Sequence, residues 1–454
     1  MIIKKVKVKT SILNTLKEVL YNSTGQGIVK ILRNQYKSVQ IMWLTTLIFS
    51  STLCFFLITQ NILNFFKFDV NTKTRKITEI PMVFPTVSIC NKNMFQTSYA
   101  LDYIKQIIFV HNLTNIFETG NKTITDDEIQ EILFLAASNT LSNNFNDEMR
   151  KKLSLDISDT IKSCKFDDNS CGLEDFYWKY NRYLGNCFIF NSGINKSKLR
   201  ETNQIGKRNG LSLTLYHSII KELKELYPDY GLTVKIENSS NWNVDFVYGI
   251  DLLSGFSNNL VIEKIFVNKI KYPYSNCDVD YNDTNSKLSN LYKAFVYSSH
   301  PYKEQYCLDF CYQMMAYEKC NCTDQEALSL NNDFNEICLT LAQSRCLDEV
   351  YKEFLSENLI SNCMPNCPLE CHESYFKTSL SFSKFDKSDE NLLKLNIYYD
   401  ELSYTVINEA ISLSIFEVLS NIGGTLGLFL GLSLLSFVEV IEVLINVIFI
   451  LKKT

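Results

Sequence analysis

Histidines and catalytic motifs are scarce in this sequence. Only four of its 454 residues are histidines, which disfavours a histidine-based metal site. Segment 67–416 contains no nucleophile elbow, metal-ligand cluster or phosphate-binding glycine loop, so nothing in it favours an enzyme. It also has no internal repeat and no Gly/Ser-rich linker. We therefore expect one continuous domain there, with neither catalysis nor a bound cofactor.

Charge is not concentrated in this chain. The net charge is −5 and the basic residues gather only in a short N-terminal run, so we expect no nucleic-acid partner. Two stretches, 38–66 and 418–438, carry no charge at all, and the second resumes as an apolar run to Leu451 after Glu439 and Glu442. About 20 apolar residues span a bilayer as a helix. Both stretches are therefore predicted to cross a membrane.

The flanking charges predict the orientation of the two spans. Residues 1–40 carry eight Lys or Arg and one acid, and Lys452 and Lys453 follow the second span. Positive flanks stay in the cytoplasm, and the first ten residues lack the apolar core of a signal peptide. We therefore expect a plasma-membrane protein with a cytoplasmic segment 1–38, a helix at 39–66, an extracellular domain at 67–416, a second helix at 417–451 and a cytoplasmic end at 452–454.

The cysteines give independent support for an extracellular domain. Of the fifteen cysteines, Cys54 lies in the first span and the other fourteen lie between the spans. An even number in an extracellular segment indicates a disulfide framework of up to seven bridges. The same segment holds sequons for N-glycosylation that we predict to be used, at Asn112, Asn121, Asn195, Asn238 and Asn282.

The extracellular segment has strand-like runs at both ends and helical stretches between them, so we predict an α+β fold. The run at 82–90 is rich in β-branched and aromatic residues, and 393–407 alternates apolar with polar residues. Segment 128–138 is the best amphipathic helix. Further strands are predicted at 187–193, 210–217, 232–238 and 260–272.

Cysteines recur at four-residue spacing in the block from 285 to 371. Residues four apart share one face of a helix, so two antiparallel elements bridged as a ladder would pair Cys307 with Cys367 and Cys311 with Cys363. Two further pairs would nest inside that loop. Connectivity cannot be deduced from sequence alone, so other pairings stay open. The nested pairs are Cys320–Cys346 and Cys322–Cys338.

Six segments in order resemble the degenerin/epithelial sodium channel family, in particular its acid-sensing and peptide-gated branch. They are FPTVSICN (84–91), CFIFNSG (187–193), YPYSNC (272–277), CPLECHESYF (367–376), NIYYDELSY (396–404) and GGTLGLFLGLSLLSFVEVIE (423–442). The resemblance covers nearly the whole chain.

The resemblance implies a trimer, homomeric or with related subunits, whose extracellular domain has a palm of strands, a thumb of disulfide-bridged helices, and finger and knuckle helices. It implies a free thiol at Cys54. It also implies three further disulfides, Cys90–Cys187, Cys164–Cys171 and Cys277–Cys371.

The second span carries the residues that the resemblance assigns to a pore. Glycines recur at 423, 427 and 431, a spacing that by itself also suits close helix packing. The resemblance places the selectivity filter for permeant Na⁺ at Gly431, Leu432 and Ser433, where backbone carbonyls can replace a cation's hydration shell. Carboxylates inside a span are costly and usually functional. The resemblance therefore assigns cation attraction to Ser436, Glu439 and Glu442.

Further positions carry over to gating and block. Ser420 stands at the degenerin position, where a small side chain lets the gate close, and Gly427 matches the position associated with amiloride block. Near the N-terminus Gly27 of the His-Gly gating motif is kept, and Gln26 replaces the histidine. Tyr274 matches the aromatic that couples the thumb to the first span, with Phe66 or Phe68 as contacts.

The stimulus is the least determined property. We rank a neuropeptide first, then protons, mechanical force or constitutive opening, all by analogy. A membrane-anchored adhesion or receptor ectodomain is the alternative from another class. Five acids could form a proton-sensing cleft, although solvated helix faces suit them better: Glu222, Glu225, Asp348, Glu349 and Glu353.

Overall fold

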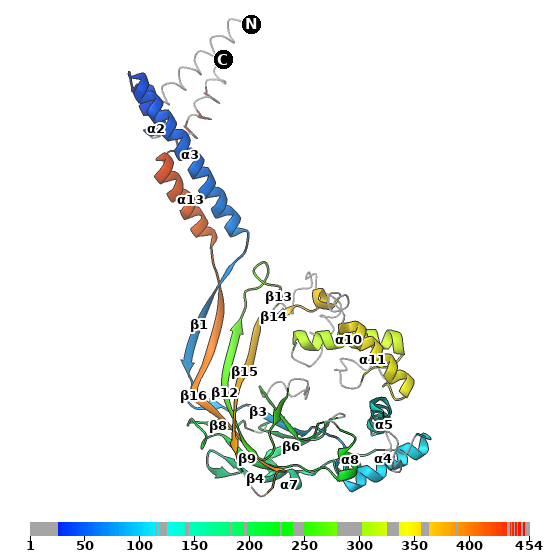
Figure 1. The fold of residues 1–454 in the computed structure, drawn as a ribbon. Helices are drawn as coiled ribbons and strands as arrows, with labels where there is room; N and C mark the ends of the chain where they lie inside the picture. The colour runs from blue at the N-terminus through cyan, green and yellow to red at the C-terminus, as the bar shows by residue number, and fades with distance from the viewer. Residues whose placement is uncertain are drawn as a thin grey trace. The chain divides into compact units, whose positions relative to one another are not determined.

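The computed structural model forms two compact units, 1–72 with 409–454, and 73–408 (Figure 1). The structure describes residues 26–113, 117, 125–140, 145–181, 184–194, 198–227, 229–238, 249–278, 302–324, 336–355, 363–385, 389–433, 436, 438, 439, 441, 442, 444, 445, 448 and 449.

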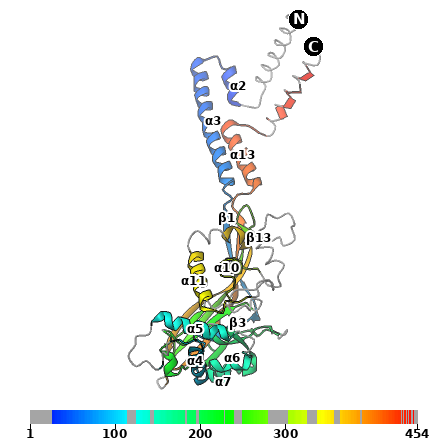
Figure 2. The ribbon, with the colours of Figure 1, turned by 90° about the vertical axis from the view of Figure 1, so that its right-hand side faces the viewer.

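Helices make up the first unit. α2 (Gln26–Arg33) leads into α3 (Lys37–Phe65), and α13 (Ile415–Leu430) lies beside α3 (Figure 2). Among the described residues α3 is the one helix long and apolar enough to cross a membrane, whereas α13 is a shorter apolar helix. The amide of Asn61 on α3 donates to the Val418 carbonyl on α13 at 3.5 Å, and the Cys54 and Val418 side chains are buried. The rest of α3 exposes large apolar side chains, as expected of a helix in lipid.

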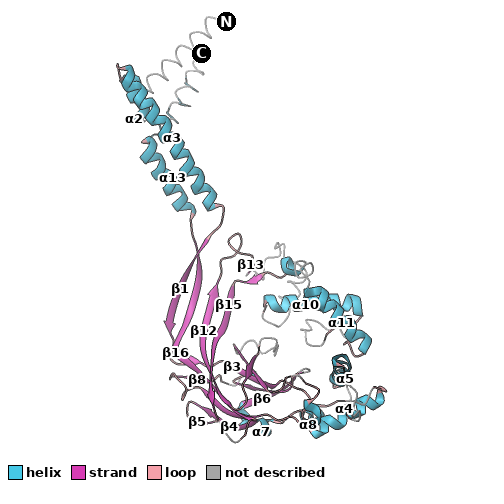
Figure 3. Ribbon diagram, in the orientation of Figure 1, coloured by secondary structure: helices cyan, strands magenta, loops and turns pink. Residues whose placement is uncertain are grey.

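A seven-stranded sheet runs through the second unit (Figure 3). The strand order is β15-β12-β16-β9-β4-β5, and β1 pairs with β16. β12 and β16 are parallel. The pairs β15–β12, β16–β9, β9–β4 and β4–β5 are antiparallel. The strands are β1 (Val70–Thr78), β4 (Ile161–Phe166), β5 (Asn169–Ser170), β9 (Leu211–Tyr216), β12 (Phe256–Asn268), β15 (His372–Lys384) and β16 (Leu392–Ile411).

A five-stranded sheet of order β11-β10-β3-β7-β6 shares a core with the first. Val87 and Phe188 on one sheet and Leu213 and Ile397 on the other belong to a single buried cluster, because alternate side chains of each strand face inward. The five strands are β3 (Thr86–Asn91), β6 (Phe176–Asn181), β7 (Gly185–Phe190), β10 (Leu232–Glu237) and β11 (Ile250–Leu252). Two short pairs are β2 (Met82–Val83) with β8 (Glu201–Thr202), and β13 (Cys277–Asp278) with β14 (Leu369–Glu370).

A second buried cluster joins helices inserted between the strands. It includes Ile104, Ile132, Leu153 and Leu223. Thr125 caps α5 through a reciprocal capping box with Glu128, which satisfies backbone N–H groups at the helix start. The helices here are α4 (Ser98–Val110), α5 (Asp126–Asn139), α6 (Asp147–Leu153), α7 (Ile157–Thr160) and α8 (Lys221–Lys224).

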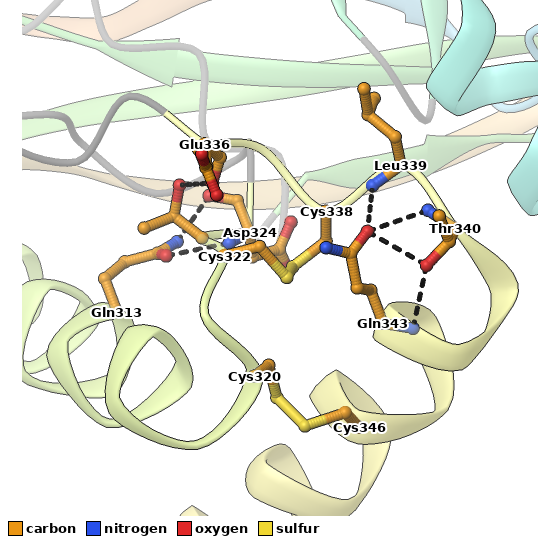
Figure 4. Close-up of a disulfide and its surroundings, with 11 residues drawn as sticks. Gln313, Cys320, Cys322, Asp324, Glu336, Cys338, Leu339, Thr340, Gln343 and Cys346 are labelled. Atoms are coloured by element: carbon orange, nitrogen blue, oxygen red, sulfur yellow. Dashed lines mark hydrogen bonds between the residues drawn. A yellow bond between two sulfur atoms is a disulfide. The ribbon is translucent and has the colours of Figure 1, made fainter.

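Two longer helices, α10 (Glu304–Cys320) and α11 (Leu341–Leu355), pack together around a third cluster. Figure 4 shows glutamine side chains that form hydrogen bonds with the backbone of the segment between the two helices. The buried Gln313 accepts from the Asp324 N–H at 2.8 Å and donates to the Asp324 carbonyl at 2.6 Å. Gln343 accepts from the Thr340 N–H at 2.9 Å and thereby caps α11.

The mixed α and β architecture agrees with the predicted fold class. The strands predicted at 187–193, 210–217, 232–238, 260–272 and 393–407 correspond to β7, β9, β10, β12 and β16, and the predicted helix 128–138 lies within α5. We did not predict β1 or β15. Every residue of these two strands is exposed or half-buried. The polar β1 carries no apolar alternation. In β15, however, residues 376–383 alternate large or β-branched side chains with lysine and serine, a strand pattern that we overlooked.

His217 makes the stability of the second unit depend on pH. It is buried, and its Nε2 lies 2.5 Å from the Ser254 hydroxyl. Burial lowers the pKa of His217 below its usual value; Lys224 lowers it further and Asp389 opposes the shift. Below about pH 6.5 His217 therefore binds a proton in the unfolded chain but stays neutral in the folded chain. The free energy of unfolding decreases as the pH falls, until the pH is below the pKa of His217 in the folded chain.

We expect thermal unfolding of the detergent-solubilised full chain to occur at lower temperature as pH falls from about 7.5 to about 5. His217→Gln keeps a polar partner for Ser254 but does not titrate, so this variant should lose part of the pH dependence. An unchanged pH dependence in the variant would show that other groups account for it.

Candidate functional site

The helix α13 stops inside the apolar C-terminal run. It ends at Leu430, and Gly431 adopts φ +65°, a left-handed conformation that favours glycine. The Gly431 N–H donates to the Gly427 carbonyl at 3.1 Å, and the Leu432 N–H donates to the Leu426 carbonyl at 3.3 Å. The predicted second span at 417–451 is therefore not a single continuous helix.

Helical conformation resumes at Ser436, the next described residue after Ser433. The Ser433 N–H donates to the Ser436 hydroxyl at 3.1 Å, and the Ser436 N–H donates to the Ser433 carbonyl at 3.0 Å. The triplet Gly431–Ser433 is thus a non-helical turn held by hydrogen bonds on both sides. Non-helical backbone at membrane depth is tolerated only where it is buried in protein or lines water.

One face of α13 points away from α3. Val418 packs toward α3 and is 8% exposed, and each further residue turns about 100° around the helix. Ser420, Gly424 and Gly427 therefore lie roughly opposite Val418. A Cβ added at Gly424 would meet nothing within 4 Å, and one at Gly427 would meet only the Leu432 carbonyl oxygen at 3.7 Å. Within one chain this small-residue face is open.

The other residues with an expected role in conduction or gating lie as follows. Glu439 is half-buried and Glu442 is exposed. Gln26 and Gly27 are the first two residues of α2. Tyr274 lies in a turn of the second unit, where its N–H donates to the Lys271 carbonyl at 3.3 Å. Its expected contacts belong to the first unit, where Phe65, Phe66 and Phe68 form an aromatic cluster.

Fourteen cysteines of the second unit form seven disulfides, and these are the pairs expected from the sequence. Cys54 is free and buried. Cys320–Cys346 connects α10 with α11, and two bridges connect α10 with the chain after α11. Cys322–Cys338 lies within the segment between the two helices. Cys90–Cys187 links the paired strands β3 and β7. The pairs are Cys90–Cys187, Cys164–Cys171, Cys277–Cys371, Cys307–Cys367, Cys311–Cys363, Cys320–Cys346 and Cys322–Cys338.

The four-residue spacing reflects one helix face at Cys307 and Cys311 but not at Cys363, Cys367 and Cys371. Cys307 and Cys311 do lie on a helix, α10. Cys363 and Cys367, however, flank a short 3₁₀ turn, Met364–Asn366, and Cys371 lies between β14 and β15. Pro365 inside the 3₁₀ turn explains the difference, since proline lacks the N–H that a longer helix would use.

Comparison with known proteins identifies the family. A profile described as "Amiloride-sensitive sodium channel" matches residues 19–443. The chain belongs to this family. It is 26% identical over 447 residues to the bile acid-sensitive ion channel of Homo sapiens, in an alignment that covers 93% of this chain and 84% of the relative. It is 25% identical over 452 residues to acid-sensing ion channel 1 of Gallus gallus, in an alignment that covers 93% of this chain and 82% of the relative. With epithelial sodium channel subunit beta of Neoceratodus forsteri the identity is 28% over 313 residues, or 64% and 47% of the two chains.

The family membership confirms the resemblance drawn from the six motifs. Its members are ion channels of the plasma membrane, not enzymes, and they assemble from related subunits. Ion conduction is therefore the activity against which the geometry around Gly431–Ser433 has to be judged.

The structure pairs one of the five candidate acids, Glu353, with a basic side chain. Lys319 on α10 donates to the Glu353 carboxylate on α11, so Glu353 faces a cation. Glu222 lies in the short helix α8. Arg345 on α11 and Glu131 on α5 approach to 4.0 Å, which pairs the two helices through opposite charges.

Two of the predicted glycosylation sites lie in the described chain. Asn112 is exposed with φ +51°. Asn238 is half-buried, and its amide donates to the Ser374 hydroxyl on β15, which limits the room for a glycan. Asn121, Asn195 and Asn282 lie outside the described residues.

Sequence reasoning missed two polar contacts. Lys76 on β1 donates to Glu401 on β16, and this contact holds the pKa of Glu401 below its usual value. No pattern in the polar β1 segment indicates that pair. The bond between Ser433 and Ser436 was also missed, because the residue that accepts from the N-cap N–H in a capping box is normally Glu or Gln, and here a serine takes that place.

Proposed function

We propose that the chain is one subunit of a trimeric, sodium-permeable, amiloride-sensitive channel that an extracellular neuropeptide opens. In this proposal α3 and the segment from α13 to Leu451 both cross the plasma membrane, and both termini are cytoplasmic. The segment 67–416 is extracellular. The observation that carries the proposal is the hydrogen-bonded break in α13 at Gly431–Ser433.

The break supports a selectivity filter at Gly431, Leu432 and Ser433. A turn of this kind leaves the regular helix ladder, so its carbonyl groups can point toward a central axis and replace water around a cation. Ser433 is exposed within one chain. The small-residue face of Ser420, Gly424 and Gly427 points away from α3, which suits close approach of three such helices around an axis. On that face Gly427 would meet amiloride.

Carboxylates beyond the filter support cation preference. Three subunits would place Glu439, and further along Glu442, in rings of three acids that attract cations and repel anions. Sodium is the permeant ion in this scheme, and no cofactor takes part.

Gating rests on analogy more than on geometry. Ser420 would allow closure, Gln26 and Gly27 would act at the cytoplasmic end, and Tyr274 would couple the thumb to the first span. The names of two relatives add bile acids and acid as candidate stimuli. Mechanical or constitutive opening completes the alternatives within the family.

Two-electrode voltage clamp of oocytes expressing the full chain tests the proposal. Candidate peptides, a bile acid and acid are applied in turn, and Ser420→Phe supplies a channel that needs no stimulus. The expected inward current disappears when sodium is replaced by a large organic cation, and amiloride blocks it. If the wild type and Ser420→Phe both reach the cell surface but give no current, alone and with related subunits, the result would favour an adhesion or receptor protein.

A further inference from the structure

We propose that Ser436 positions the backbone of the Gly431–Ser433 triplet and does not itself line the ion path. This inference rests on the proposed function and refines it, because the sequence alone assigned Ser436 to cation attraction. Ser436 is only 8% exposed, whereas Ser433 is exposed. Its hydroxyl accepts from the Ser433 N–H at 3.1 Å, and its own N–H donates to the Ser433 carbonyl at 3.0 Å.

The three N–H groups of the triplet have different kinds of acceptor. Those of Gly431 and Leu432 donate to backbone carbonyls of α13, so the helix itself holds them. The N–H of Ser433 donates to a side chain. The Ser436 hydroxyl also lies 3.5 Å from the Ser433 hydroxyl. A substitution at Ser436 therefore removes contacts to Ser433 and leaves the N–H bonds of Gly431 and Leu432 in place.

Peptide planarity connects that bond to the filter. The Ser433 N–H and the Leu432 carbonyl belong to one trans peptide group and point in opposite directions. The Ser436 hydroxyl, by holding this N–H, therefore fixes the direction of the Leu432 carbonyl. That carbonyl lies at the centre of the proposed filter, so the hydroxyl of Ser436 determines how sharply the filter discriminates between cations.

The first test measures ion selectivity in the Ser420→Phe background, where current flows without a stimulus. Ser436→Ala removes the acceptor and should lower the sodium-to-potassium permeability ratio by about fivefold, the factor expected for one lost hydrogen bond. Ser436→Thr keeps a hydroxyl and should retain the parent ratio. An unchanged ratio in Ser436→Ala, with normal surface expression, would overturn the proposal.

A second test needs no current. In a Cys54→Ser background, which removes the free thiol, Ser433→Cys and Ser436→Cys are exposed to a charged, water-soluble methanethiosulfonate-biotin on intact cells. We expect Ser436→Cys to react at less than about a tenth of the rate of Ser433→Cys, since thiol labelling follows exposure. Equal rates would place Ser436 on the ion path and overturn the proposal. A chain that labels in this pattern but never conducts would contradict the channel function and leave the placement of Ser436 supported.

Discussion

Ser420→Phe is expected to give a standing inward sodium current in cells that express the full chain without any stimulus. Ser420 lies on the face of α13 that points away from α3, where three copies would meet in the closed channel. Overpacking a tight contact costs about 1–3 kcal/mol. Because about 1.4 kcal/mol changes an equilibrium tenfold, the open-to-closed ratio should rise by about tenfold or more.

Leu419→Phe is the matched control. Leu419 precedes Ser420 directly, is 62% exposed, and lies about 100° away around the helix. It also adds an aromatic ring to α13, but on a face that lipid can accommodate. Basal current close to wild type in Leu419→Phe, together with large current in Ser420→Phe, would tie the effect to the face. Equal currents in the two variants would contradict the placement of Ser420 on a face of α13 that meets its copies.

Gly210→Ala should prevent most of the chain from reaching the cell surface. Gly210 has φ +102°, and a Cβ there would lie 2.4 Å from the carbonyl oxygen of Ile397 on the neighbouring strand β16. The left-handed conformation alone costs about 1–2 kcal/mol for an L-residue. Relieving the clash would also require β9 and β16 to separate, so we expect a total loss of roughly 3 kcal/mol or more.

Gly206→Ala separates strain from collision. Gly206 also has positive φ, +87°, but a Cβ there meets nothing within 4 Å. This variant should lose only about 1 kcal/mol and fold nearly as well as the wild type. Surface biotinylation and thermal unfolding of the detergent-solubilised full chain measure both variants. Similar losses in the two would mean that β9 can shift to accept the methyl group.

The sequence predicted those parts of the fold in which burial imposes a pattern. β10, β12 and β16 supply buried side chains to the core, and α3 carries no charged residue after Lys37 and is mostly apolar. β1 has no such pattern, because it is held by backbone pairing with β16 and exposes most of its side chains. Its existence depends on a neighbouring strand that local sequence does not reveal. β15 also exposes most of its side chains, but its residues 376–383 do alternate, so its sequence could have indicated a strand.

The candidate pore shows the same division. Gly431 was singled out from its motif, and its positive φ gives a physical reason for glycine there. The role of Ser436 could not be read from its position, because a serine in a membrane span suits a water-lined path and a capped turn equally well. Only the placement of its hydroxyl beside the Ser433 N–H distinguishes the two.

The seven disulfides have an order that matters during synthesis. No two of them cross along the sequence. Cys164–Cys171 lies inside Cys90–Cys187, and the four bridges between residues 307 and 367 lie one within another inside Cys277–Cys371. In the proposed topology, segment 67–416 enters the endoplasmic reticulum from its N-terminal side, and the native partner of each arriving second cysteine is the most recently delivered thiol that is still unpaired. The native set therefore forms without reshuffling only if first cysteines of different bridges, such as Cys307 and Cys311, do not pair with each other before their partners arrive.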